Sequence, residues 1–151
     1  IARCNALIDD ALAKGARLLT GGRANDTHMS PTLLDGVTRE MRLWREESFG
    51  PVKAIIRVHS EEEALAVAND SEYGLSAAVY SRDSARAWNV AQRLHTGICH
   101  INGPTVHDEA QMPFGGCKAS GYGRFGGRAG IAEFTELRWI TIQTQPRELP
   151  F

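Results

Sequence analysis

Apolar positions near the start of this chain of 151 residues recur at the spacing of an α-helix. The apolar face predicted over residues 1–14 consists of Cys4, Leu7, Ile8, Ala11 and Leu12. Short apolar runs at residues 16–20 and 31–34 then predict two strands, separated by a polar loop.

The pattern changes between residues 52 and 101, where strands and helices are expected to alternate. The predicted elements are a strand at 52–58, a helix capped by Ser60 and running to about Asn69, a strand at 75–80, a helix capped by Asp83 or Ser84, and a strand at 98–101. This order describes two βαβ units and predicts a parallel, right-handed sheet covered by helices. In such sheets ligands bind beyond the carboxyl ends of the strands.

A long glycine-rich loop, Asn102–Gly127, follows the last of these strands. Its second half, Met112–Gly127, holds six of the fifteen glycines of the chain. Residues 121–126 match G-x-G-x-x-G, the fingerprint of a dinucleotide-binding turn. A true fingerprint follows a strand and has an acidic partner about twenty residues later, whereas residues 115–120 are not a strand and 138–142 contain no acid. We therefore expect a loop whose glycines permit a tight path.

Composition narrows the class of protein without identifying it. The chain is 42% hydrophobic and 23% charged, with a net charge of −1, so it lacks the basic footprint of a nucleic-acid-binding protein. No apolar run reaches the ~18 residues of a membrane span. The three scattered cysteines, with no C-x-x-C, favour free thiols in a reducing, cytoplasmic compartment. Ile1 is not a Met and starts inside a predicted helix, so we expect a fragment.

Two groups of side chains could carry chemistry. In Glu46–Pro51 a carboxylate pair precedes an aromatic residue and Gly-Pro, a turn that could fix a carboxylate for two hydrogen bonds from a ribose diol. A solvated helix end leading into a strand explains the same residues. The second group contains metal-ligand types at spacings that match no zinc pattern, so we expect ordinary loop histidines and no metal; it comprises His95, His100, His107, Asp108 and Glu109.

The thiols are not obvious nucleophiles. Cys117 lies beside Lys118, which could lower a thiol pKa, but no base to activate it is identifiable. We interpret Cys117 as an incidental thiol and Cys99, which sits within an apolar strand, as a core residue.

Four motifs occur along the chain in a fixed order: Glu46–Pro51, Asn69–Leu75, Gly97–Asn102, and Pro113–Gly116 followed by Lys118, Ser120, Gly121, Gly123 and Arg124. Their order and spacing resemble the C-terminal part of the NAD(P)-dependent aldehyde dehydrogenases, over residues 1 to about 144. The branch acting on aromatic aldehydes, such as salicylaldehyde, vanillin and benzaldehyde dehydrogenases, is the most similar. That narrower resemblance rests on residues 107–109, 125–127 and 139–146.

The resemblance implies roles for individual residues. Glu47 would hold the nicotinamide ribose hydroxyls of NAD or NADP, and Phe49 would pack beside the nicotinamide ring. Phe114 would line the aldehyde pocket, with residues 103–113 forming part of its entrance. Residues 1–136 would be the C-terminal part of the catalytic domain. The strand Leu137–Thr144, within a 137–151 tail, would pair across subunits of a homo-oligomer, either a dimer or a tetramer.

The family mechanism uses a Cys thiolate, which forms a thiohemiacetal with the aldehyde, and a Glu that activates water to hydrolyse the resulting thioester. Both positions would lie upstream of this chain, and none of its cysteines matches them. The resemblance thus implies no catalytic residue here and no turnover by this segment alone. Two alternatives remain open: a non-catalytic folded or assembly module, and a related semialdehyde or acyl-phosphate reductase.

Overall fold

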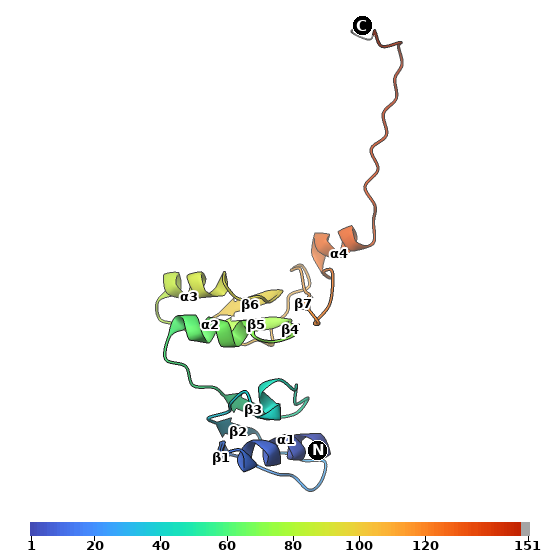
Figure 1. Ribbon diagram of the computed structural model, residues 1–151. Helices are drawn as coiled ribbons and strands as arrows, with labels where there is room; N and C mark the ends of the chain where they lie inside the picture. Colours follow the sequence, from blue (N-terminus) through green and yellow to red (C-terminus); the bar gives the residue numbers. More distant parts are fainter. Residues whose placement is uncertain (149–151) are drawn as a thin grey trace. The chain divides into compact units, whose positions relative to one another are not determined.

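The computed structural model describes residues 1–148 and divides into two compact units, one up to Ser71 and one from Glu72 onward. The first contains α1 (Ala2–Ala13), β1 (Arg17–Thr20), β2 (Thr32–Asp35), the 3-10 helix η1 (Arg42–Trp44), β3 (Val52–Ile55) and α2 (Glu61–Asn69). The second contains β4 (Tyr73–Gly74), β5 (Ser76–Val79), α3 (Ser84–Ala91), β6 (Ile98–Ile101), β7 (Cys117–Lys118) and α4 (Gly127–Glu133). Figure 1 labels both sets of elements.

A three-stranded sheet of order β1-β2-β3 forms the centre of the first unit (Figure 1). Strand β1 runs antiparallel to β2, whereas β2 and β3 are parallel, with Leu34 opposite Ala54. The buried face of α1 joins the same core as β2, η1 and β3. That core consists of Cys4, Leu7, Ile8, Ala11, Ala16, Leu34, Val37, Met41, Leu43 and Val52. The predicted amphipathic helix is thus confirmed, although Leu12 at its margin remains exposed.

Asp35, at the end of β2, is a buried carboxylate held by two arginines. Its Oδ2 accepts hydrogen bonds from Arg57 Nη2 at 2.7 Å and Arg17 Nη2 at 2.9 Å, and its Oδ1 accepts from Arg57 Nε at 2.9 Å. Because these donors stabilise the ionised form, Arg57 first and Arg17 second lower the pKa of Asp35 from 3.8 to about 2, against the opposing effect of burial.

The stabilisation that Asp35 provides is expected to be lost in acid. Its folded-state pKa lies below the unfolded value, so the stabilisation is complete above the unfolded pKa of 3.8 and disappears as the pH falls towards about 2. Asp35→Asn should lower the thermal midpoint at neutral pH and flatten its fall over that window, as measured by circular dichroism. Asp9→Asn, which disrupts an exposed pair with Arg23, is the control. Identical acid profiles for wild type and Asp35→Asn would contradict this assignment.

In the second unit, β5, α3 and β6 form a parallel βαβ arrangement, as predicted. Helix α3 begins after Asp83, whose Oδ1 accepts a hydrogen bond from Arg86 N at 3.0 Å. Beyond the strands, Asn102 adopts a left-handed φ of 56°. Its side-chain amide accepts from Ser81 N and donates to Ser81 O, both at 2.9 Å. The carboxyl ends of β5 and β6 are therefore joined by side-chain bonds before the long loop starts.

The glycine-rich loop contains paired backbone that the sequence did not predict. Strand β4 pairs antiparallel with β7, and Phe114 forms an isolated antiparallel bridge with Phe125. Helix α4 follows this loop. From Thr135 to residue 148 the chain has no helix or strand and runs as an extended segment (Figure 1). Within residues 1–148, no helix is long and apolar enough to cross a membrane.

Two details of the predicted fold need correction. The α/β class is confirmed, but the sheets are mixed, and β3 pairs with β2 while β5 pairs with β6. Strand β3 ends at Ile55 rather than at residue 58, because its partner β2 ends where Gly36 turns the chain with a φ of 72°. The expected strand Leu137–Thr144 has no partner within the described chain, and all its residues are exposed. That strand, which was expected to pair with another subunit, and the separation of residues 1–136 from the tail both stay predictions.

Candidate functional site

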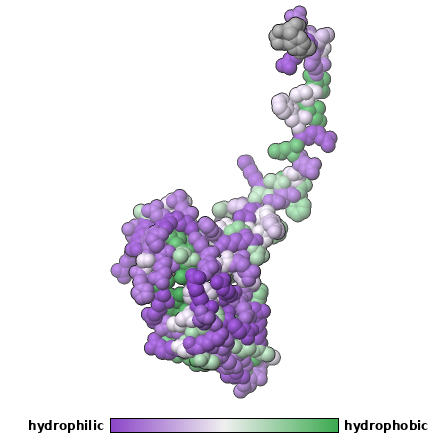
Figure 2. Space-filling model, in the orientation of Figure 1, coloured by the Kyte–Doolittle hydropathy of each residue, from purple (hydrophilic) through white to green (hydrophobic). Residues whose placement is uncertain are grey.

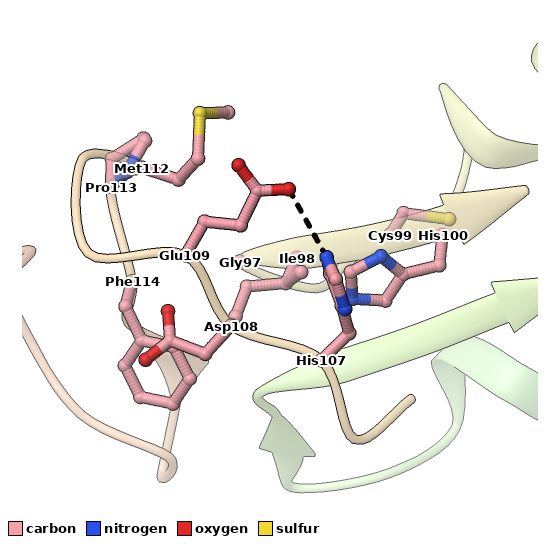
Figure 3. A pocket seen from close by; sticks show the side chains of 10 residues that line it. All are labelled: Gly97, Ile98, Cys99, His100, His107, Asp108, Glu109, Met112, Pro113 and Phe114. Atoms are coloured by element: carbon pink, nitrogen blue, oxygen red, sulfur yellow. Dashed lines mark hydrogen bonds and ion pairs between the residues drawn. The ribbon is translucent and has the colours of Figure 1, made fainter. Parts of the chain in front are cut away.

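A cavity of about 380 Å³ lies in the second unit, between β6 and the loop that follows it. Residues 97–100 line it from the strand, and residues 107–109 and 112–114 line it from the loop (Figure 3). The ring of Phe114 and the side chains of Met112 and Ile98 supply apolar surface. The cavity thus combines an aromatic wall with several polar groups, which is typical of small-molecule sites.

Close backbone contact holds the Phe114 segment in place. A Cβ on Gly97 would overlap the carbonyl oxygen of Gly115 and lie 2.8 Å from its carbonyl carbon, so only glycine allows the loop to approach β6 so closely. Phe114 N donates to Phe125 O at 3.0 Å, and Phe125 N donates to Phe114 O at 2.7 Å. These contacts fix the path of the chain on both sides of the Phe114 side chain.

Arg124 closes the same loop from within. Its Nη1 donates to Gly116 O at 2.7 Å and to Gly123 O at 2.6 Å. One guanidinium group therefore satisfies two carbonyl oxygens that lie on either side of the Cys117–Ser120 turn. The motif Arg is structural in this conformation: it binds backbone rather than projecting into the cavity.

Two of the three histidines that the sequence analysis interpreted as loop residues, His100 and His107, line this cavity. His107 Nε2 lies 3.3 Å from Glu109 Oε1, and the ring of His107 meets that of His100 edge-on, with centroids 5.5 Å apart. Figure 3 shows the two rings side by side, with Glu109 reaching His107 from the loop. The sequence did contain a signal for this: His100 lies on the predicted strand Ile98–Ile101 and His107 lies in the loop directly after it. Within residues 1–148, no group of three His, Cys, Asp or Glu side chains could hold a metal ion.

Neither thiol of the second unit is arranged as a nucleophile. Cys99 is half-buried on β6, and burial raises its pKa, which disfavours the reactive thiolate. Cys117 Sγ donates to the backbone oxygens of His95 at 3.2 Å and Gly74 at 3.5 Å. Both thiols therefore act as small packing groups in this conformation.

The turn Glu46–Pro51 lies in the first unit, and its two carboxylates have different surroundings. Glu46 is held by Arg42, whose Nε and Nη2 donate to its two oxygens at 2.7 and 3.0 Å. This hydrogen bonding lowers the pKa of Glu46. The Glu47 carboxylate is exposed, and the described residues offer it no ion pair. Glu47 therefore keeps its acceptor oxygens available for a ligand.

Phe49 is presented to solvent by the same turn. Its backbone has a φ of 47°, which few non-glycine residues adopt, and its side chain is 85% exposed. Ser48 Oγ donates to Gly50 O at 3.0 Å and to Val52 O at 3.1 Å, so the turn is stabilised from inside. A large aromatic ring held out by a strained residue is unusual for a purely structural turn.

The G-x-G-x-x-G letters do not form a phosphate cradle. A Cβ on Gly123 would lie 2.8 Å from the carboxylate of Glu133, and Glu133 Oε1 accepts a hydrogen bond from Arg124 N at 3.2 Å. A Cβ on Gly126 would lie even closer to the backbone oxygen of Met112. Negative and partly negative oxygens thus occupy the space that a pyrophosphate would need, which supports the expectation of a tight structural loop.

Sequence comparisons cover nearly the whole chain. Residues 1–140 match the model described as the Aldehyde dehydrogenase family. Vanillin dehydrogenase from Pseudomonas fluorescens is 64% identical over 148 residues, which is 98% of this chain and 31% of that protein.

Two solved structures give the same result in three dimensions. Salicylaldehyde dehydrogenase from Pseudomonas putida G7, complexed with salicylaldehyde, superposes with a TM-score of 0.92 at 50% identity, covering 99% of this chain and 31% of that one. Mycobacterium tuberculosis aldehyde dehydrogenase complexed with NAD+ superposes with a TM-score of 0.82 at 37% identity, covering 89% and 29%. The chain therefore spans less than a third of the length of the relatives it matches.

Proposed function

Because the chain belongs to the aldehyde dehydrogenase family, we propose that the whole protein oxidises an aromatic aldehyde to its carboxylic acid with NAD or NADP. The observation that carries this proposal is the cavity beside β6, with the Phe114 ring in its wall. An aromatic wall favours a flat apolar substrate, because contact between aromatic rings contributes binding energy beyond that of the buried apolar surface. The vanillin and salicylaldehyde dehydrogenases described above support the same substrate class.

Within this chain, Glu47 and Phe49 are the residues that fit a dinucleotide. The cofactor, when bound, supplies the acceptor for the hydride that leaves the aldehyde. The Glu47 carboxylate has two acceptor oxygens and forms no ion pair with the described residues. It can therefore accept one hydrogen bond from each hydroxyl of a ribose diol. Phe49 offers an exposed ring two residues away, suited to a flat heterocycle. We therefore assign orientation of the nicotinamide end of the cofactor to these two side chains.

Replacing Phe114 by alanine is expected to change aldehyde selectivity in the intact protein. Loss of the ring should lower kcat/KM for benzaldehyde by about tenfold relative to an aliphatic semialdehyde, because aromatic contact contributes roughly 1–1.5 kcal/mol. Initial rates with NAD+ and with NADP+, over a panel of aromatic and semialdehyde substrates, measure this. Phe125→Ala is the matched control, since Phe125 pairs with Phe114 through backbone but does not line the cavity. Unchanged relative kcat/KM in Phe114→Ala would remove Phe114 from the pocket.

We further propose that Leu137–Thr144 pairs with a second copy of the protein in a homo-oligomer. Figure 2 shows apolar side chains spaced along this extended segment. Trp139, Ile140 and Ile142 are 91%, 72% and 84% exposed, which is costly for large apolar groups without a partner. The alternating pattern suits addition of a strand to the edge of another sheet.

Charged residues at Ile140 and Ile142 are expected to weaken assembly. The double variant Ile140→Asp/Ile142→Asp would place carboxylates where apolar contact is needed, and should shift the intact protein to a smaller species in sedimentation velocity. Thr141→Asp/Gln143→Asp, on the other face of the same segment, is the control. An unchanged sedimentation coefficient in the Ile variant would exclude this segment from the contact.

A further inference from the structure

A cleft in the first unit lies between the Glu46–Pro51 turn and β3. Its volume is about 280 Å³, and it is lined by Glu47, Ser48, Phe49, Gly50 and Lys53. The turn folds back towards the strand because Ser48 Oγ donates a hydrogen bond to Val52 O at 3.1 Å. One side of the cleft therefore carries a carboxylate and an aromatic ring, and the strand adds an ammonium group.

The position of Lys53 follows from the alternation of side chains along β3. Successive residues of a strand project from opposite faces of the sheet. Val52 is only 1% exposed because it packs into the core, so the next residue, Lys53, projects from the other face and is exposed. The sheet thus presents a cation at the turn that carries Glu47 and Phe49.

The two opposite charges of this cleft do not neutralise each other. Glu47 and Lys53 line the same cleft, yet within residues 1–148 neither side chain forms an ion pair. Arg3, a second cation beside the turn, is already engaged. Its Nη2 donates to the backbone oxygen of Glu47 at 2.6 Å and lies 3.9 Å from Glu46 Oε2. A ligand that enters the cleft therefore meets an uncommitted carboxylate and an uncommitted ammonium group.

A nicotinamide nucleotide carries three groups that match these side chains. Its ribose bears the flat nicotinamide ring, a pair of adjacent hydroxyls and, on the far side, a phosphate. The hydroxyls suit Glu47 and the ring suits Phe49, as proposed above. The phosphate is anionic, so the Glu47 carboxylate repels it unless a cation lies nearby. Lysine supplies a compact point charge on a flexible stem and commonly binds phosphate.

We propose that Lys53 binds the cofactor phosphate that is attached to the nicotinamide ribose, so that Glu47 and Lys53 together hold the two sides of that ribose. This inference rests on the proposed oxidation with NAD or NADP and adds a binding residue to the same site. Both cofactors carry this phosphate, so the contact contributes affinity without selecting one of them. Lys53 therefore acts on the binding of the cofactor and not on the reacting atoms.

Equilibrium titration of the intact protein with the cofactor that it uses, NAD+ or NADP+, tests this contact. Lys53→Gln is expected to raise the Kd about tenfold at low ionic strength, because it removes a hydrogen bond between charged groups. Lys53→Arg keeps the charge and should stay within about threefold of the wild type. Added salt should narrow the difference between Lys53→Gln and the wild type, since screening weakens a contact between charges but not a packing contact.

Lys14→Gln is the matched control. Lys14 also belongs to the first unit, but it pairs with Asp10 at 2.7 Å and does not line the cleft, so its loss should leave the Kd unchanged. A Kd for Lys53→Gln within about twofold of the wild type at low ionic strength would exclude the phosphate contact. A loss of affinity that Lys53→Arg does not restore, and that salt does not reduce, would exclude it as well.

Cofactor reduction by a panel of aromatic aldehydes is scored separately with the wild type. No reduction with any of these aldehydes would overturn the proposed function. Reduction together with an unchanged Kd in Lys53→Gln would overturn only the role of Lys53.

Discussion

Replacing Glu47 by glutamine in the intact protein is expected to slow hydride transfer about 10- to 100-fold, with little change in stability. The variant keeps the size of the side chain but loses the charge, and a hydrogen bond to a charged group contributes roughly 1.5–3 kcal/mol. A looser ribose leaves the nicotinamide less well oriented towards the aldehyde. Single-turnover appearance of the reduced cofactor, after rapid mixing with saturating aldehyde, measures this step directly.

Glu46→Gln is the appropriate control for that experiment. Glu46 precedes Glu47 in the same turn, but both of its oxygens are occupied by Arg42, so its loss should affect the turn rather than the ligand. We expect a single-turnover rate close to wild type in Glu46→Gln. Equal rates in Glu47→Gln and wild type would exclude Glu47 as a cofactor ligand.

Gly97→Ala is expected to be the most damaging single methyl group in the second unit. Its Cβ would collide with the backbone of Gly115, which cannot move without displacing the bridge that holds Phe114. Overpacking of this kind costs about 2–3 kcal/mol of the free energy of unfolding. We therefore expect a lower midpoint in urea together with a raised KM for the aldehyde.

The same substitution at Gly103 separates crowding from a general intolerance of alanine. At Gly103 the nearest atom to a new Cβ is His100 Cβ at 3.7 Å, which is ordinary van der Waals contact. Gly103→Ala should change the free energy of unfolding by no more than about 0.5 kcal/mol. A stable Gly97→Ala variant with unaltered KM would show that the loop has room to relax.

Local features of the fold were predictable because they depend on neighbours in sequence. Ser60 caps α2 as expected, accepting a hydrogen bond from Glu63 N at 3.1 Å, and strand Ile98–Ile101 has the predicted bounds. The end of β3 was not predictable from its own residues, because it depends on where Gly36 turns the neighbouring strand. The hydrophobic periodicity of a strand does not identify the strand with which it pairs.

The site shows the same division. Phe114 and Glu47 were singled out by their motifs; Phe114 lines the cavity and Glu47 is exposed, and their roles stay predictions. The meeting of His100 with His107 was missed, because the spacing of these residues matched no metal pattern and was therefore interpreted as incidental. Their relation is a matter of shape: a strand and the loop after it fold back on one cavity. Neither the motifs nor the composition predicts that this loop folds back beside the strand.

The unpaired segment after α4 has the composition of a segment that promotes aggregation. Residues 139–144 contain β-branched and aromatic side chains with no charge, proline or glycine, which is the composition of segments that aggregate as stacked strands. Charges at Glu136 and Arg138 and the proline at Pro146 flank this stretch, as gatekeeper residues do in other proteins. Pairing with another subunit would therefore cover an aggregation-prone segment as well as stabilise the oligomer.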